Sequence, residues 1–200
     1  TLSSLAAAAV SFCTREHPMD GIRYIHAADL HRDPPFQGLS RVAADGRLTR
    51  LLQEATFTAM DRLFRLCVAD RPDVLVLAGD VYNEEIHSVK AQLKLCDGCR
   101  ALADAGVRVF IAHGNHDPLF SRLTAVHWPD NVTIFGADVE HHVVERDGSP
   151  VAVVHGISHT KIKEGRNLAR LFQRDAGYDC FQLGVLHCTV GGQGTADRYA

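Results

Sequence analysis

The chain has 200 residues, enough for one domain with a substantial hydrophobic core. Apolar residues make up 46% of it and charged residues 22%, which excludes a disordered or fibrous protein. The net charge is −3 with histidine neutral, so no overall positive field indicates nucleic acid binding. No apolar run approaches the roughly 18 residues of a membrane helix, so we expect no membrane association. Twelve histidines beside 24 carboxylates favour a search for metal or acid–base chemistry.

The six cysteines lie in segments with helix or strand patterns and not in a small, loop-rich frame. Reduced thiols in a cytoplasmic protein are therefore expected. Cys96 and Cys99 have CxxC spacing, but they lie within a helical pattern and lack a second cysteine pair. We interpret them as core thiols, with a redox or zinc site as the alternative.

Met19 directly precedes the first strong strand pattern, and the residues at the start of the chain are small and apolar. We expect residues 1–18 to be an N-terminal extension of unclear origin and residues 19–200 to form the domain.

Strand and helix patterns alternate over the first half of the chain. In order, the predicted elements are a strand over 22–27, a helix over 48–67, a strand over 74–78, a helix over 88–105 and a strand over 107–112. Apolar residues recur every three or four positions in the first helix, which is typical of an amphipathic helix. The strand over 74–78 is a continuous apolar run, as in strands covered on both faces. Gly106 suits the C-terminal cap of the second helix.

The second half of the chain has a different rhythm. The predicted elements are a strand over 132–135, a hairpin of strands 141–145 and 151–155 around residues 147–150, a short helix over 167–174 and a strand over 181–187. Residues 191–194 read as a loop. Alternating strands and helices followed by hairpin-like strands predict an α/β fold with two packed sheets and helices outside.

Four predicted strands end in the same way, with an apolar run followed by side chains that can ligate metal. These side chains are Asp29 with His31, Asp80, Asn115 with His116, and His187. Functional groups gather beyond the carboxyl ends of strands in layered α/β proteins. The period of two puts Asp29 and His31 on one side, and Asp80 after Gly79 offers a carboxylate that can bridge two ions.

Carboxylate, imidazole and amide ligands suit Mn²⁺ or Fe²⁺, and Zn²⁺ less exclusively. Two such ions, roughly 3.5–4 Å apart, clamp the attacking and leaving oxygens in phosphoesterases. Each motif is weak alone, because a D-x-H triplet is usually a solvated loop and a Gly-Asp pair is usually a turn. Their conjunction in this order is specific.

Three motifs resemble those of the calcineurin-like metallophosphoesterase superfamily. They are Asp29-Leu30-His31, Gly79-Asp80 and Gly114-Asn115-His116-Asp117. Segments 25–31 and 110–118 are similar to its DNA-repair exonuclease branch, which includes the SbcD-type nucleases and their YhaO-like relatives. Segments 154–159 and 184–188 strengthen this resemblance, which covers residues 21–200. It implies a four-layer α-β-β-α sandwich of two mixed sheets, the metallo-dependent phosphatase fold.

The resemblance also implies a site for two divalent ions, Mn²⁺ with Fe²⁺ or Zn²⁺ as alternatives. Asp29, His31 and Asp80 would hold one ion, and Asp80, Asn115 and His187 would hold the other.

The resemblance assigns catalytic roles to two further residues. His116 would donate a proton to the leaving oxygen, steered by Asp117, and the nucleophile would be a metal-bridging hydroxide. The implied function is a two-metal DNA exonuclease or phosphodiesterase, with a homodimer and an SMC-like ATPase as partners.

Two departures from the family pattern leave alternatives open. No Gly-His-x-His motif occurs before Ala200, so we expect the domain to lack its final His-x-His strand and to be C-terminally incomplete. Asn83 stands where repair nucleases often carry a histidine. The alternatives are a metallophosphoesterase acting on a small phosphoester and a truncated, non-catalytic fragment.

The other histidines and the helical arginines have mainly structural interpretations. For His155 and His159 a position near the substrate is the alternative. For the arginines at 41, 47, 50, 62 and 65 the alternative is contact with a phosphate backbone.

Overall fold

A computed structural model describes residues 11–12, 21–30, 47–81, 89–120 and 126–188. Its first sheet has the strand order β1-β2-β3-β4-β5, in which β2 to β5 are parallel and β1 is antiparallel to β2. These strands are β1 (Ser11–Phe12), β2 (Tyr24–Ala27), β3 (Val74–Ala78), β4 (Arg108–Ala112) and β5 (Val132–Ile134). The short β1 lies within the segment that we expected to be an extension, and it pairs with the edge of β2.

The second sheet has the order β6-β7-β8, with β6 antiparallel and β8 parallel to β7. Its strands are β6 (Glu140–Arg146), β7 (Ser149–Gly156) and β8 (Phe181–Val185). The predicted hairpin is present, and Asp147 and Gly148 form its turn with φ of 52° and 75°. Positive φ at both central residues is typical of the tight hairpin turns that match strand twist.

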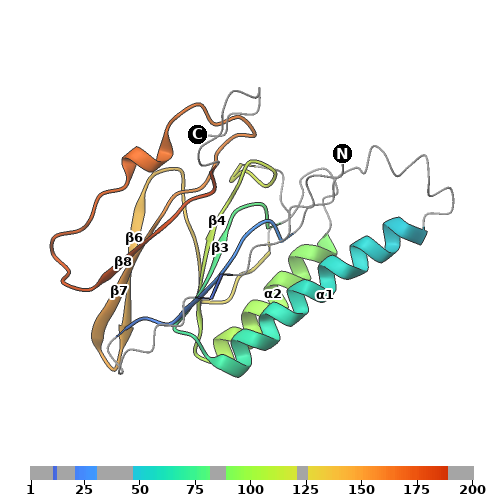
Figure 1. Cartoon of the computed structure of the whole chain (residues 1–200), viewed down its shortest axis with the longest axis horizontal. Coiled ribbons are helices and arrows are strands. Elements are labelled where there is room, and N and C mark those ends of the chain that lie inside the picture. The colour runs from blue at the N-terminus through green and yellow to red at the C-terminus, as the bar shows by residue number, and fades with distance from the viewer. Residues whose placement is uncertain (1–10, 13–20, 31–46, 82–88, 121–125, 189–200) are drawn as a thin grey trace.

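The molecule is layered, with the two sheets face to face and both helices on the other side of the first sheet (Figure 1). The helices are α1 (Arg47–Asp70) and α2 (Val89–Asp104). Among the described residues, no α-helix covers the outer face of the second sheet. The segment predicted as a helix over 167–174 forms only the 3₁₀ helix η2 (Leu168–Leu171). Neither described α-helix is long and apolar enough to span a membrane.

Successive side chains of β3 point to opposite faces of the first sheet, which explains why this sheet has a hydrophobic core on each face. Leu75 and Leu77 pack with the helices, whereas Val74 and Val76 pack toward the second sheet. Burial removes each of these side chains from water, which contributes about 1.5–3 kcal/mol per large apolar side chain. The continuous apolar run at 74–78 therefore marks a strand covered on both faces, as predicted.

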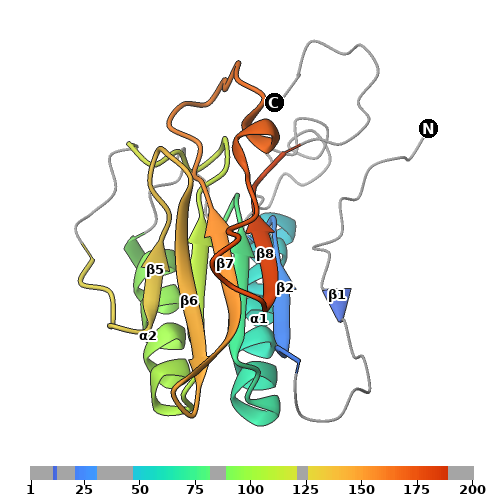
Figure 2. The same ribbon diagram turned by 90° about the vertical axis from the view of Figure 1, so that its left-hand side faces the viewer.

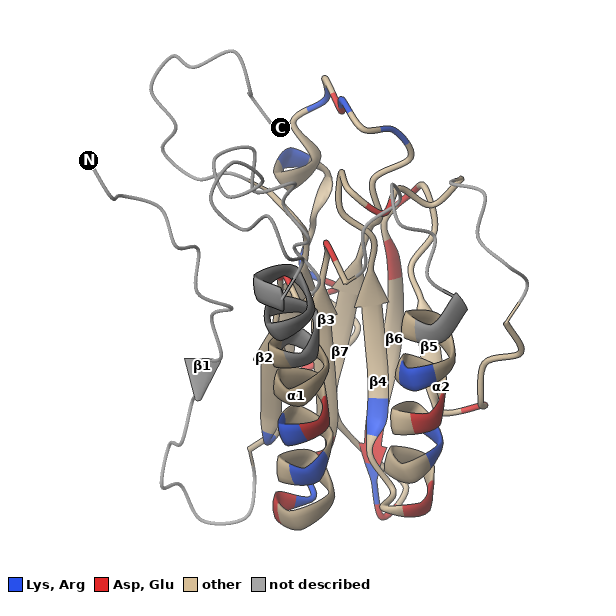
Figure 3. Cartoon of the chain, turned by 90° about the vertical axis from the view of Figure 1, so that its right-hand side faces the viewer, with Lys and Arg blue, Asp and Glu red and all other residues tan. Residues whose placement is uncertain are grey.

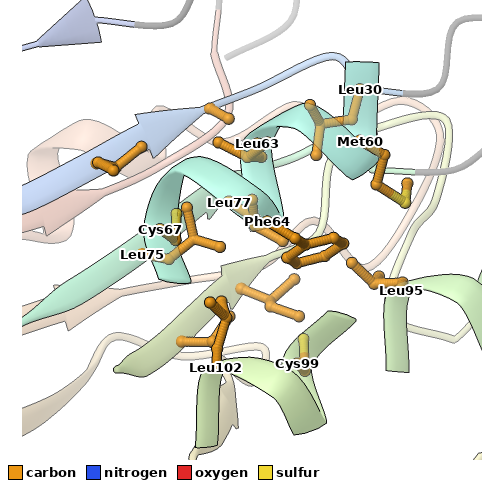
Figure 4. Packing of buried hydrophobic residues seen from close by; sticks show 14 of the residues in the cluster. Leu30, Met60, Leu63, Phe64, Cys67, Leu75, Leu77, Leu95, Cys99 and Leu102 are labelled. Carbon is orange, nitrogen blue, oxygen red and sulfur yellow. The ribbon is translucent and has the colours of Figure 1, made fainter. Parts of the chain in front are cut away.

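On the helical side, α1 presents apolar side chains at steps of three and four (Figure 4). These residues are Met60, Leu63, Phe64 and Cys67, all buried. Helix α2 ends in a Schellman cap, in which Gly106 has φ of 76° and the Val107 N–H donates to the Leu102 carbonyl at 2.9 Å. The predicted cap is thus confirmed.

The CxxC pair of α2 belongs to the buried interior. Cys96 and Cys99 are free thiols with no exposed surface. Burial raises the pKa of Cys99 to about 12. A thiol with such a pKa is not ionised at neutral pH and is a poor nucleophile or metal ligand. The interpretation as core thiols is confirmed.

Candidate metal centre

Asp29, Asp80 and His187 come together at the carboxyl ends of three strands. They follow β2, β3 and β8, whose ends lie at the same edge of the layered sheets (Figure 2). One ligand atom of each, two carboxylate oxygens and an imidazole nitrogen, lie within 4.8 Å of one another. Asp80 is buried, whereas Asp29 and His187 are half-buried, so the group is reachable from solvent.

The backbone bends sharply at both aspartates. Asp29 and Asp80 have φ of 54° and 51°, and Gly79 has φ of 80°. Aspartate tolerates this left-handed conformation better than most residues, but it is strained, and such strain concentrates at functional sites. The Asp29 N–H donates to the Gly79 carbonyl at 3.1 Å, which ties the two bends together.

The imidazole of His187 is oriented by a backbone carbonyl. Its Nδ1 lies 3.0 Å from the Ala78 oxygen, and a carbonyl can only accept, so Nδ1 carries a proton. Its Nε2 then faces Asp80 Oδ2 at 3.4 Å. In the neutral imidazole Nε2 holds a lone pair, which a cation beside the carboxylate would satisfy. Metal-binding histidines typically donate their other ring N–H in this way.

Two glycines allow the Asp80 carboxylate and the His187 imidazole to lie close together. A Cβ on Gly79 would overlap the His187 ring. A Cβ on Gly114 would lie 2.7 Å from the Asp80 nitrogen and 3.0 Å from His187 Cδ2. Any side chain at either position would displace the imidazole or the carboxylate.

Asp117 is fully buried behind this group and binds backbone amides. Its carboxylate accepts from the N–H groups of Asp80 at 3.1 Å, Val81 at 3.0 Å and Gly114 at 2.6 Å. It also lies 3.4 Å from His113 Nδ1. These contacts fasten the loop after β3 to the loop after β4, and the role in steering His116 that the resemblance implied stays a prediction.

Two further predicted residues, Asn115 and His116, lie on the loop after β4, which contacts this group. The His116 N–H donates to Asp80 Oδ1 at 3.0 Å, and its side chain is exposed. Asn115 is buried, and its amide nitrogen has no hydrogen-bond partner among the described residues. The unpartnered atom is a hydrogen-bond donor, and only the amide oxygen of Asn115 could bind a cation. His31 and Asn83 lie outside the described residues.

Burial raises the pKa of the Asp80 carboxyl, and a positive charge on the His187 ring would oppose this rise. Placing two carboxylates so close together in a buried site is costly without positive charge. A divalent cation would supply that charge, so the donor set and its electrostatics fit a metal.

His159 also belongs to this region. It is fully buried, and its Nε2 donates to the His187 carbonyl at 2.7 Å. Its own backbone pairs with the β4 loop, through N–H to the His113 carbonyl at 2.9 Å and carbonyl to the Leu119 N–H at 2.8 Å. His159 therefore positions the segments that carry His187 and Asn115. The sequence left a structural role and a position near the substrate open for His159, and these contacts support the structural role.

His155, the other histidine with two interpretations, has its contacts within the second sheet. Its Nε2 lies 3.0 Å from Gln182 Oε1, and its ring packs near that of His141.

Comparison with known proteins agrees with this geometry. The family model described as calcineurin-like phosphoesterase matches residues 22–183. The chain is 34% identical over 179 residues to an uncharacterized metallophosphoesterase, YhaO, of Bacillus subtilis, covering 89% of this chain and 43% of that protein. It is 31% identical over 98 residues to the DNA double-strand break repair protein Mre11 of Aeropyrum pernix, covering 48% of this chain and 21% of that protein. The chain thus spans less than half the length of these relatives. It belongs to the calcineurin-like phosphoesterase family.

Proposed function

We propose that this protein is a metal-dependent phosphodiesterase that cleaves DNA, of the DNA-repair exonuclease type. The family supports hydrolysis of a phosphoester, and the similarity to a DNA double-strand break repair protein favours DNA as the substrate. The observation that carries the proposal is the group formed by Asp29, Asp80 and His187, in which His187 Nε2 lies 3.4 Å from a carboxylate oxygen of Asp80.

Two divalent ions would be held at this group. Asp29, His31 and Asp80 would bind one ion, and Asp80, Asn115 and His187 the other. The mixture of oxygen and nitrogen donors favours Mn²⁺, with Fe²⁺ or Zn²⁺ as alternatives. When bound, such ions lower the pKa of water and neutralise charge on a phosphate.

The chain's own groups would orient the substrate and move the proton. The exposed imidazole of His116 stands next to Asp80, to which its own backbone N–H is bonded at 3.0 Å. This position suits a donor of a proton to the oxygen that leaves the phosphate. Asp117 and His159 would hold the surrounding loops, so that the donor and the ligands keep their relative positions.

The test is hydrolysis by the purified protein of end-labelled linear duplex DNA, an aryl phosphodiester and an aryl phosphomonoester, each with Mn²⁺ or with EDTA. We expect Mn²⁺-dependent shortening of the DNA, lost in Asp80→Ala and retained in the matched variant Asp73→Ala. Hydrolysis of small esters without any cleavage of DNA would favour the small-phosphoester alternative. DNA cleavage that persists in EDTA and in Asp80→Ala would show that the proposal is wrong.

The family resemblance also predicts a homodimer and an SMC-like ATPase as partners. Size-exclusion chromatography with light scattering tests the first of these predictions.

A further inference from the structure

Two loops lie side by side next to the metal centre. The Leu119 N–H donates to the His159 carbonyl at 2.8 Å, which joins the loop after β4 to the loop after β7. The His159 side chain in turn reaches the His187 carbonyl at 2.7 Å. Phe120 directly follows Leu119, and Lys161 lies two residues after His159. They therefore lie at the edge of the site.

The most exposed large apolar side chains of the described residues flank this junction. Phe120 is 73% exposed and Ile162 is 56% exposed, more than any other large hydrophobic residue that the structure describes. Single exposed apolar residues are common on proteins. Two of them on adjoining loops beside a catalytic centre are typical of a surface that contacts a ligand.

The same loop is positively charged, although the chain is not. Between residues 158 and 174 there are five basic residues and one acidic residue, in a chain of net charge −3. The acidic residue, Glu164, is engaged by Arg166 at 2.9 Å. Lys161 and Lys163 are exposed and form no ion pair with the described residues. Figure 3 shows basic residues on the loop above the carboxyl ends of the strands.

We propose that Phe120, Lys161, Ile162 and Lys163, here called the Phe120 surface, bind an unpaired strand of the nucleic-acid substrate. This inference rests on the proposed function. The lysines would contact phosphates on either side of the scissile one, and Phe120 would stack on a base. An aromatic ring can stack only on a base that is free of its partner, so the surface favours single-stranded or frayed ends over intact duplex.

The experiment measures binding of a fluorescent single-stranded oligonucleotide and of the matching blunt duplex by anisotropy, in EDTA so that no hydrolysis occurs. Phe120→Ala is expected to weaken binding of the single strand by about 5- to 150-fold and binding of the duplex much less. The double variant Lys161→Gln with Lys163→Gln is expected to lower the dependence of log affinity on log salt by about 1.4.

Matched controls lie on α1, on the far side of the first sheet. Val68→Ala removes an exposed apolar side chain, and Arg62→Gln with Arg65→Gln removes two exposed charges. Both are expected to bind the oligonucleotide as the wild type does. An unchanged unfolding temperature in all four variants shows that folding is retained.

Two results would overturn the inference. One is wild-type binding by the Phe120 and lysine variants, and the other is equal loss for single strand and duplex in Phe120→Ala. Neither bears on the proposed function, which depends on Mn²⁺-dependent cleavage. Conversely, absence of DNA cleavage with selective loss of single-strand binding would contradict the proposed function and leave the Phe120 surface as a binding site.

Discussion

Strand β3 has an aspartate near each end, and the two carboxylates have different surroundings. Before the strand, Asp73 accepts from the Arg146 guanidinium at 2.6 and 3.1 Å and from the Arg23 N–H at 2.7 Å. After the strand, Asp80 faces the imidazole of His187 at 3.4 Å and lies in one group with a second carboxylate, Asp29. The first charge is balanced by an arginine, whereas the second lies beside another carboxylate in a group that could hold a metal ion.

The aspartate before β3 therefore serves the packing of the two sheets, whereas the aspartate after β3 belongs to the candidate site. Arg146 extends from β6 to Asp73, so this ion pair joins the second sheet to the first and contributes to stability. Asp80 is buried at an energetic cost, which raises the pKa of its carboxyl. Functional sites often retain such unfavourable electrostatics because ligand binding offsets them.

The largest expected effect comes from removing the Asp80 carboxylate, which we propose bridges two ions. Asp80→Ala should abolish binding of both ions, because each ion loses a ligand. Changes outside the first ligand shell cost 10–100-fold in metal affinity, so we expect a loss greater than about 100-fold. Isothermal titration with Mn²⁺ measures it, and two sites at near-native affinity would refute the bridging role.

His116→Ala should impair proton transfer and leave metal binding intact. General acid catalysis contributes about 10²–10⁴-fold, so turnover on DNA should fall by that order while Mn²⁺ affinity is retained. An aryl ester, whose leaving group needs less protonation, should be affected less. Steady-state rates on both substrates check this, and loss of Mn²⁺ binding would reassign His116 as a ligand.

A smaller effect is expected from filling the space between the ligands. Gly114→Ala places a methyl group against Asp80 and His187, so Mn²⁺ affinity should fall by about 10- to 100-fold. Gly21→Ala, at the opposite end of the first sheet, meets no atom within 4 Å and is the matched control. Titration of both variants with Mn²⁺ gives the comparison. Equal affinities would show that the close approach at Gly114 is unimportant.

Asp73→Ala should show the reverse pattern, with loss of stability and intact metal binding. The Asp73 and Arg146 side chains are 19% and 33% exposed, so solvent screens the pair in part. We expect the free energy of unfolding to fall by about 1–2 kcal/mol. Urea denaturation measures this change. A fall in Mn²⁺ affinity in the same variant would mean that the two ends of the strand are coupled.

The smallest effect concerns Glu164, a carboxylate paired with arginine on the exposed loop. The hydrogen bonds from Arg166 lower the pKa of Glu164 to about 2, from an ordinary 4.5. A lowered pKa stabilises the fold above pH 4.5, and this contribution is lost as the pH falls toward 2. Because Arg166 is 49% exposed, Glu164→Gln should cost less than about 1 kcal/mol at neutral pH. Denaturation of both proteins at pH 7 and pH 3 should give a smaller difference at pH 3, and a constant difference would contradict the pairing.

Elements with strong apolar patterns were predicted well from the sequence. Strand β3 has the predicted bounds, and α2 differs from the prediction by one residue at each end. The helix predicted over 167–174 is only the 3₁₀ helix η2, in which Leu168 is buried and Leu171 is exposed. With a single buried apolar residue, the segment has no face whose burial would stabilise a longer helix.

The sequence by itself determined the family, the alternation of strands and helices, and the chemical types of the residues at the strand ends. These are local properties, because apolar periodicity and motif spacing depend on residues that are near one another in the sequence. The family resemblance implied that Asp29, Asp80 and His187 share a site, but only the tertiary structure brings their ligand atoms within 4.8 Å, since this depends on strand order across two sheets. The tertiary structure also decided which nitrogen of His187 faces Asp80, what the Asp117 carboxylate binds, and that Phe120 stands exposed beside the site. Such contacts arise between segments far apart in the chain, so no local pattern specifies them.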